Sequence, residues 1–176
     1  MANPLTAWLK LAPVLLLLAP PASAQDAKRL VKAEQEVKHL EQKYEKEQKK
    51  DAVHQAKALA KLLPKVVEAA GLEIQAGQVD QGIGALTHYR DEAQRVYQAL
   101  LATNRNAVKK PDGFKQLQIA LRESVRGLRA VAYQMPFSRR SSVEAVRADL
   151  EQLNGQILQK LFPAPKPKHK KGDKDS

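Results

Sequence analysis

The sequence predicts an all-α protein, an antiparallel up-down four-helix bundle preceded by an N-terminal helical arm. Two observations carry this prediction. Apolar residues recur at steps of three and four, which places them on one face of a helix, and no stretch alternates with the two-residue period of a strand. Four helical stretches of similar length are joined by short links. They are residues 51–76, 79–101, 113–135 and 142–161.

The first 24 residues have the features of a secretory signal peptide. Residues 11–19 form an apolar run that is too short to span a bilayer, which takes about 20 residues. The segment Ala22-Ser23-Ala24 follows as a site for signal peptidase. We therefore expect a mature protein that begins at Gln25 without a transmembrane span, in the bacterial periplasm or outside the cell.

The composition limits the chemistry of the chain. It contains no cysteine, which excludes disulfides, thiolate nucleophiles and thiolate metal sites. It has 30 lysines and arginines against 19 acidic residues, a formal net charge of +11. A basic exported protein is suited to an acidic protein, an anionic polymer or lipid headgroups, and charge alone does not choose among them. The sequence shows no motif for specific nucleic-acid recognition.

Residues 25–50 are predicted to form a charged helical arm that either projects from the bundle or folds back on it. Their apolar stripe lasts for only two heptads, and it consists of Leu30, Ala33, Val37, Leu40 and Tyr44. It is a candidate seam for a homodimer, and its narrowness predicts that residues 51–162 fold without the arm. At the other end, residues 163–176 are rich in proline, lysine and aspartate, and we expect them to be disordered.

The predicted bundle domain, residues 51–162, contains several signals for helix boundaries. Pro64 interrupts the first stretch, but the apolar stripe keeps its phase across the proline, which favours a bent and continuous helix. Asp112 is the expected cap of the 113–135 helix. Ser141 has capping-box spacing to Glu144 and is expected to open the last helix.

Candidate metal and catalytic groups do not assemble into a site in the sequence. Glu36 and His39 have Glu-x-x-His spacing, but a di-iron site needs a second such pair on another helix. His88, Asp91 and Glu92 lie opposite an apolar stripe, so we expect them in solvent. No serine lies in a Gly-x-Ser-x-Gly context. The sequence therefore predicts a protein that is not an enzyme and holds no metal or cofactor.

The 113–135 stretch carries the main candidate binding face. Arg122, Arg126 and Arg129 recur at helical spacing away from the apolar stripe, and Arg139 and Arg140 follow just after the helix. Arginine binds carboxylate and phosphate through paired hydrogen bonds. We therefore expect these arginines to contact an anionic partner. The alternative is a solvated face that acids of adjacent helices partly neutralise.

These features favour an exported, non-enzymatic protein that acts as a binding or scaffolding module through its arginine face or its arm. Two other functions stay open from the sequence. One is a bundle that carries a ligand or cofactor in the periplasm, and the other is a protein that binds anionic polymers or lipid headgroups.

Overall fold

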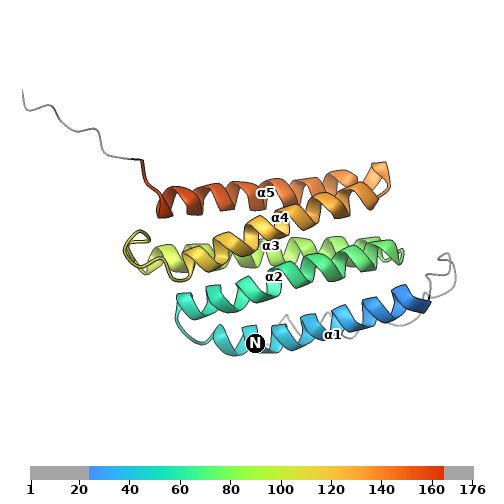
Figure 1. Cartoon of the computed structure of the whole chain (residues 1–176), viewed down its shortest axis with the longest axis horizontal. Coiled ribbons are helices and arrows are strands. Elements are labelled where there is room, and N and C mark those ends of the chain that lie inside the picture. Colours follow the sequence, from blue (N-terminus) through green and yellow to red (C-terminus); the bar gives the residue numbers. More distant parts are fainter. Residues whose placement is uncertain (1–23, 165–176) are drawn as a thin grey trace, which may run out of the picture.

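The computed structural model describes residues 24–164, and every regular element in that range is an α-helix. The predicted all-α class is therefore confirmed for these residues. The helices, coloured along the chain in Figure 1, are α1 (Ala24–Glu47), α2 (Ala52–Gln75), α3 (Val79–Ala102), α4 (Phe114–Gln134) and α5 (Phe137–Leu161). The predicted signal peptide up to residue 23, and the predicted tail from residue 165, lie outside the described residues.

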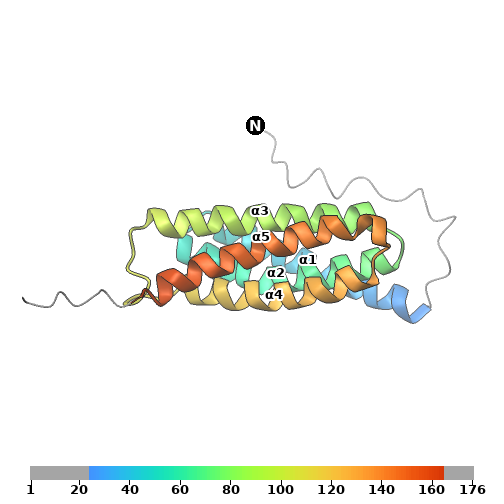
Figure 2. The same ribbon diagram turned by 90° about the horizontal axis from the view of Figure 1, so that it is seen from above.

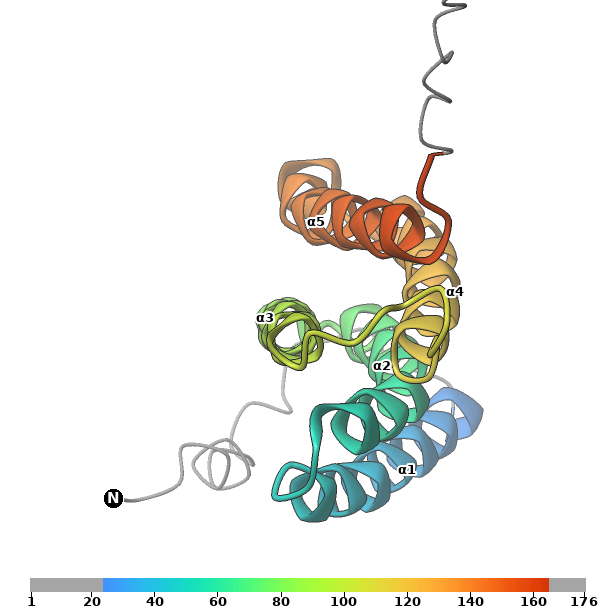
Figure 3. The same cartoon turned by 90° about the vertical axis from the view of Figure 1, so that its left-hand side faces the viewer.

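The helices lie roughly along one long axis (Figure 2), and consecutive helices run in opposite directions. Helix α2 is central and packs against α1, α3 and α4, whereas α5 packs mainly against α4 (Figure 3). Two contacts show that α2 and α4 are parallel neighbours. Lys57 pairs with Asp112 at 3.1 Å near their first turns, and Gln75 bonds Gln134 at 2.6 Å near their last turns. The α2–α3 and α4–α5 hairpins therefore pack side by side through α2 and α4.

Helix α1 packs along α2, the folded-back alternative of the two that the sequence left open (Figures 1 and 3). Its Tyr44 is 4% exposed and belongs to the hydrophobic core, and Val37 and Leu40 pack against that core. The stripe predicted as a homodimer seam is thus used within the chain. Removing α1 would expose part of this core, and the independent folding of residues 51–162 stays a prediction.

Helix α2 runs through Pro64 without interruption, as its continuous apolar stripe predicts. Leu63 and Val66, on either side of the proline, are 1% and 2% exposed. Their burial offsets the backbone hydrogen bond that an interior proline removes. At the start of the helix, the Asp51 carboxylate accepts hydrogen bonds from two backbone N–H groups of the first turn, so Asp51 acts as the N-cap.

The cap of α4 differs from the prediction. Asp112 pairs with Lys57 and does not cap the helix. The N-cap is Gly113, whose φ of 86° lies in the left-handed region that glycine adopts most readily. A Cβ at this position would lie 2.8 Å from Leu100 Cδ2, so the packing also requires glycine. The Gln116 side chain accepts a hydrogen bond from Gly113 N at 2.7 Å and closes the first turn.

Helix α5 begins earlier than its capping signal predicts. Met135 precedes a proline and is extended, with φ −81° and ψ 149°, and this conformation ends α4. Pro136 is the N-cap residue of α5, and its carbonyl accepts a hydrogen bond from Arg139 N at 3.0 Å. Ser141 therefore lies inside the helix and is not its cap. Residues 137–140, which lie between the predicted helices 113–135 and 142–161, form the first turn of α5.

Candidate functional site

The arginine face predicted from the sequence lies on the solvent side of α4. Leu121 and Leu128, on the opposite side of the helix, are fully buried in the core. Arg122, Arg126 and Arg129 are exposed. Because they are spaced by four and three residues, they form one row about 10 Å long. We call this row the arginine stripe.

The arginine stripe is not neutralised by the rest of the described chain. Arg122, Arg126 and Arg129 form no ion pair or hydrogen bond with another residue between 24 and 164. Helix α4 itself carries a single acidic residue, Glu123, beside four basic ones. On the neighbouring helices, Glu68 of α2 pairs with Lys65, and Glu144 and Glu151 of α5 pair with Arg147. The stripe is therefore available to an external anion.

The other two predicted arginines are occupied within the fold. Arg139 forms an ion pair with Asp80 in the first turn of α3. Arg140 Nε donates a hydrogen bond to the carbonyl of Ala132 at 2.9 Å, one of the last carbonyls of α4, which lack a partner in the helical hydrogen-bond ladder. The Arg140 guanidinium also lies 6.0 Å from the centre of the Phe137 ring. Because α5 starts early, both arginines lie in its first turn, where other helices are within reach.

Two residues that the sequence analysis missed extend the arginine stripe. Lys115 lies seven residues before Arg122, and Tyr133 lies four residues after Arg129, so both continue the same row. Both are exposed, and Tyr133 is 74% exposed. The helical spacing that reveals the three arginines also identifies these two positions.

A second polar cluster joins α1 to α3. Tyr44 of α1 donates a hydrogen bond to Glu92 of α3 at 2.7 Å, and Tyr89 of α3 donates one to Glu41 of α1 at 2.6 Å. Arg95 also holds Glu92 at 2.6 Å. Each helix thus supplies one tyrosine and one glutamate to the other, and we call this arrangement the tyrosine–glutamate clamp.

The pKa shifts in the clamp keep the two tyrosines protonated and favour the charged form of Glu92. Burial, followed by the nearby carboxylates, raises the pKa of Tyr44 and Tyr89, so both hydroxyls remain protonated donors. Burial alone would raise the pKa of Glu92, but the hydrogen bonds from Arg95 and Tyr44 outweigh it, and the pKa is lowered. The neutral Tyr44 hydroxyl therefore donates to a charged carboxylate, and hydrogen bonds with one ionised partner are stronger than those between neutral groups.

The metal-ligand candidates from the sequence do not converge. The expectation that Glu92 lies in solvent is wrong, because α1 brings Tyr44 against this part of α3. Asp91 pairs with Arg90 at 2.8 Å, and Glu36 of α1 pairs with Lys65 of α2. Within residues 24–164, no three histidine or carboxylate side chains are placed to hold one metal ion.

One buried carboxylate lacks a full set of partners. Glu73 of α2 is 7% exposed, and Gln81 donates a hydrogen bond to its Oε1 at 3.3 Å. Its Oε2 has no hydrogen-bond partner among the described residues. Burial, and then the charge of Glu34 on α1, raise the pKa of Glu73 to about 7, although the Gln81 hydrogen bond acts in the opposite direction. Glu73 therefore titrates near neutral pH where α1 meets α2.

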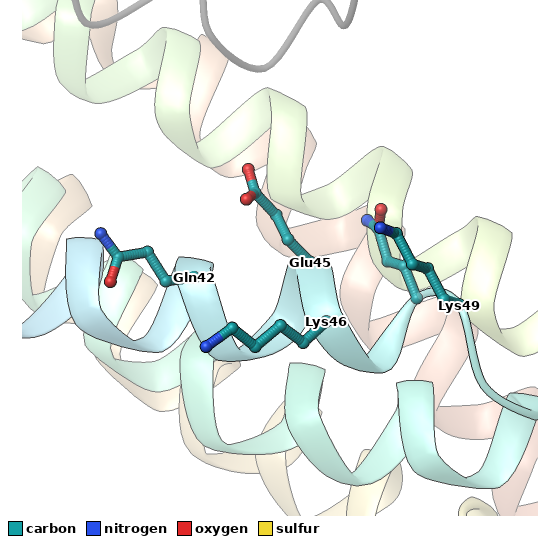
Figure 4. Close-up of a pocket in the computed structure, with 5 residues that line it drawn as sticks. Gln42, Glu45, Lys46 and Lys49 are labelled. Atoms are coloured by element: carbon teal, nitrogen blue, oxygen red, sulfur yellow. The ribbon is translucent and has the colours of Figure 1, made fainter.

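Two hollows on the described surface lie away from the arginine stripe. One lies on the outside of α1, where Gln42, Glu45 and Lys46 project as separate side chains without hydrogen bonds to one another (Figure 4). The other, about 450 Å³ in volume, lies between α3 and α5, beside the ion pair of Arg90 with Asp149 at 3.1 Å. No α4 residue lines either hollow.

Comparisons with protein-family models, curated proteins and solved structures find no match to this chain. None of the helices between residues 24 and 164 is long and apolar enough to cross a membrane.

Proposed function

We propose that this chain is a non-enzymatic binding protein that holds an anionic partner on the arginine stripe of α4. One observation carries the proposal: Arg122, Arg126 and Arg129 form an exposed row without an acidic partner in the described chain. Guanidinium groups bind phosphate and carboxylate oxygens in pairs. Because the helix fixes their spacing, a partner does not have to order three separate loops, and less conformational entropy is lost on binding.

The remaining helices form the frame for this surface. We propose that α2 to α5 act as the predicted antiparallel four-helix bundle, with α1 docked on α2. Leu121 and Leu128 hold α4 in the core from the side opposite the stripe. Substitutions of the stripe should therefore alter binding without altering the fold.

We also propose that the chain is exported through a signal peptide at residues 1–24 and acts in the periplasm or outside the cell. N-terminal sequencing of the exported protein should give Gln25 as the first residue. Exported material that still begins with Met1 would contradict this part of the proposal.

The triple substitution R122E/R126E/R129E tests the binding proposal in the full chain. Binding to polyphosphate and to anionic vesicles at low salt should fall by about 100-fold, because three attractive contacts become repulsive. The difference between variant and wild type should shrink with added salt, since exposed charges are screened over about 10 Å at 0.1 M. Unchanged binding to every anionic probe would overturn the proposal.

Two matched variants separate the arginine stripe from net charge. K32E/K43E/K46E reverses three exposed lysines of α1 that have no ion pair in the described chain. K168E/K170E/K171E makes the same charge change near the C-terminus. Both should retain most of the binding. An equal loss in the α1 variant would show that only net charge matters, and a loss confined to the second variant would assign the contact to the C-terminal lysines.

A further inference from the structure

The arginine stripe is part of a longer row whose far end is aromatic. Lys115, the three arginines and Tyr133 occupy one face of α4 over about 27 Å. Tyr133 is 74% exposed although its ring is largely apolar. The row therefore changes along α4 from cationic side chains to an amphipathic ring at the C-terminal end of the helix.

A second exposed aromatic ring lies close to this end of the row. Phe137, the first residue of α5, is 87% exposed, the most exposed of the large hydrophobic side chains between residues 24 and 164. Arg140 lies 6.0 Å from its ring centre and is tied to the end of α4 through Ala132. Cations and apolar rings are thus brought together where α4 turns into α5, at the right-hand end of Figure 1.

The shape of the exposed row on α4 indicates which kind of partner it can bind. The row lies on the convex outside of a helix, and no α4 residue lines either hollow described above. A ridge encloses little of a small ligand, but it can lie along a flat surface. An acidic protein offers carboxylates, but neither Tyr133 nor Phe137 requires a carboxylate partner. A bilayer offers phosphates in a plane and an interfacial layer that accepts aromatic rings.

We infer that this face docks on an anionic phospholipid surface, an inference that rests on the proposed anion-binding function of the stripe. Arg122, Arg126 and Arg129 contact headgroup phosphates, while Tyr133 and Phe137 enter the interfacial layer beside them. No part of α4 crosses the bilayer. The attachment is peripheral and reversible, because it combines a few screened charges with two small apolar anchors.

Vesicle partitioning of the full chain tests this inference. The probes are vesicles of phosphatidylglycerol mixed with phosphatidylcholine, vesicles of phosphatidylcholine alone, and soluble polyphosphate. The wild type should partition strongly only to the phosphatidylglycerol vesicles. R122E/R126E/R129E should lower that partition coefficient by about 100-fold at low salt. Y133S/F137S should lower it by about tenfold and leave polyphosphate binding unchanged, because the rings contact lipid and not phosphate.

A matched aromatic control is Phe162→Ser. Phe162 is 74% exposed, like Tyr133, but follows the opposite end of α5. It should leave vesicle partitioning unchanged. Circular dichroism and thermal unfolding of each variant should match the wild type, since all of the substituted side chains are exposed.

The possible outcomes separate this inference from the proposed function. If the arginine variant loses polyphosphate binding while the wild type ignores vesicles, the proposed function stands and the membrane inference is overturned. If the wild type binds vesicles but Y133S/F137S and Phe162→Ser have the same effect on partitioning, the assignment of Tyr133 and Phe137 as membrane anchors is overturned. If vesicles and polyphosphate bind the arginine variant as tightly as the wild type, both the function and the inference are wrong.

Discussion

The tyrosine–glutamate clamp and the arginine stripe use charged and aromatic side chains in opposite ways. In the clamp, Tyr44 and Tyr89 are buried, and their hydroxyls are bound by carboxylates of the facing helix. On the stripe, Arg126 and its neighbours are exposed and have no partner in the described chain, and Tyr133 beside them is exposed as well. Paired polar groups contribute to stability, whereas unpaired exposed ones are available for binding. We therefore expect mutations in the clamp to lower stability and mutations in the stripe to lower binding of anions.

Removing α1 should have the largest effect on stability. Deleting residues 25–50 would uncover Tyr89 and Glu73 and remove Tyr44, Val37 and Leu40 from the core. The lost burial corresponds to a decrease on the order of 5 kcal/mol in the free energy of unfolding. Urea unfolding followed by circular dichroism measures this change. If residues 51–162 unfold at the same midpoint as the longer chain, α1 is a dispensable arm and the clamp does not stabilise the fold.

The buried Glu73 should make stability depend on pH. The folded chain keeps a proton on Glu73 up to about pH 7, whereas an ordinary glutamate releases it near pH 4.5. The folded state therefore binds more protons in this interval. Its extra stability is fully present below pH 4.5 and is lost as the pH rises through about 7, by up to about 3 kcal/mol. Glu34 of α1 is the facing charge and Gln81 of α3 the facing amide.

The substitution Glu73→Gln should flatten this pH dependence, because glutamine is neutral at every pH. Glu34→Gln should weaken it, since the repulsion that raises the pKa of Glu73 is reduced. Thermal unfolding temperatures between pH 4.5 and 8.5 test both changes. Parallel pH profiles for the wild type and Glu73→Gln would show that another group causes the dependence.

Each hydroxyl of the clamp should contribute a smaller amount. Tyr89→Phe and Tyr44→Phe should each lower the free energy of unfolding by about 1–2 kcal/mol, because Glu41 or Glu92 loses a donor in a partly buried site. Chemical denaturation measures the decrease. Tyr133→Phe is the matched control and should change nothing measurable, since its hydroxyl is on the surface. Equal effects at all three positions would remove the distinction between the clamp and the stripe.

The arginine stripe should contribute least to stability. R122Q/R126Q/R129Q is expected to change the free energy of unfolding by less than about 0.5 kcal/mol, because exposed side chains without partners stabilise little. The same denaturation experiment measures it beside the clamp variants. A loss of 2 kcal/mol or more would mean that the arginines are part of the fold.

The inward faces of the helices were predictable from the sequence, but their neighbours were not. Apolar spacing correctly placed Leu121 in the core and carried α2 through Pro64. The same spacing does not state which helix covers a given face. The covering of Glu92 by α1, and the parallel packing of α2 with α4, depend on contacts between residues far apart in the chain. Such contacts leave no local pattern in the sequence.

The candidate site also has a part that was predictable from the sequence and a part that was not. The exposure of Arg122, Arg126 and Arg129 follows from helical spacing, and the same rule would have added Lys115 and Tyr133. The occupation of Arg139 and Arg140 was not predictable, because it depends on where α5 begins. Pro136 acts as the N-cap ahead of the Ser141 signal, so both arginines enter the first turn of the helix.

A single fluorescent label tests most directly which face of the molecule meets an anionic surface. The chain has no cysteine, so Ala130→Cys beside the arginine stripe and Gln42→Cys on the outside of α1 each give one labelling site. An environment-sensitive dye at residue 130 should shift to the blue when phosphatidylglycerol vesicles are added, while the dye at residue 42 should keep its spectrum. A shift at residue 42 without one at residue 130 would contradict the account, because the contact would then lie on α1 and not on α4.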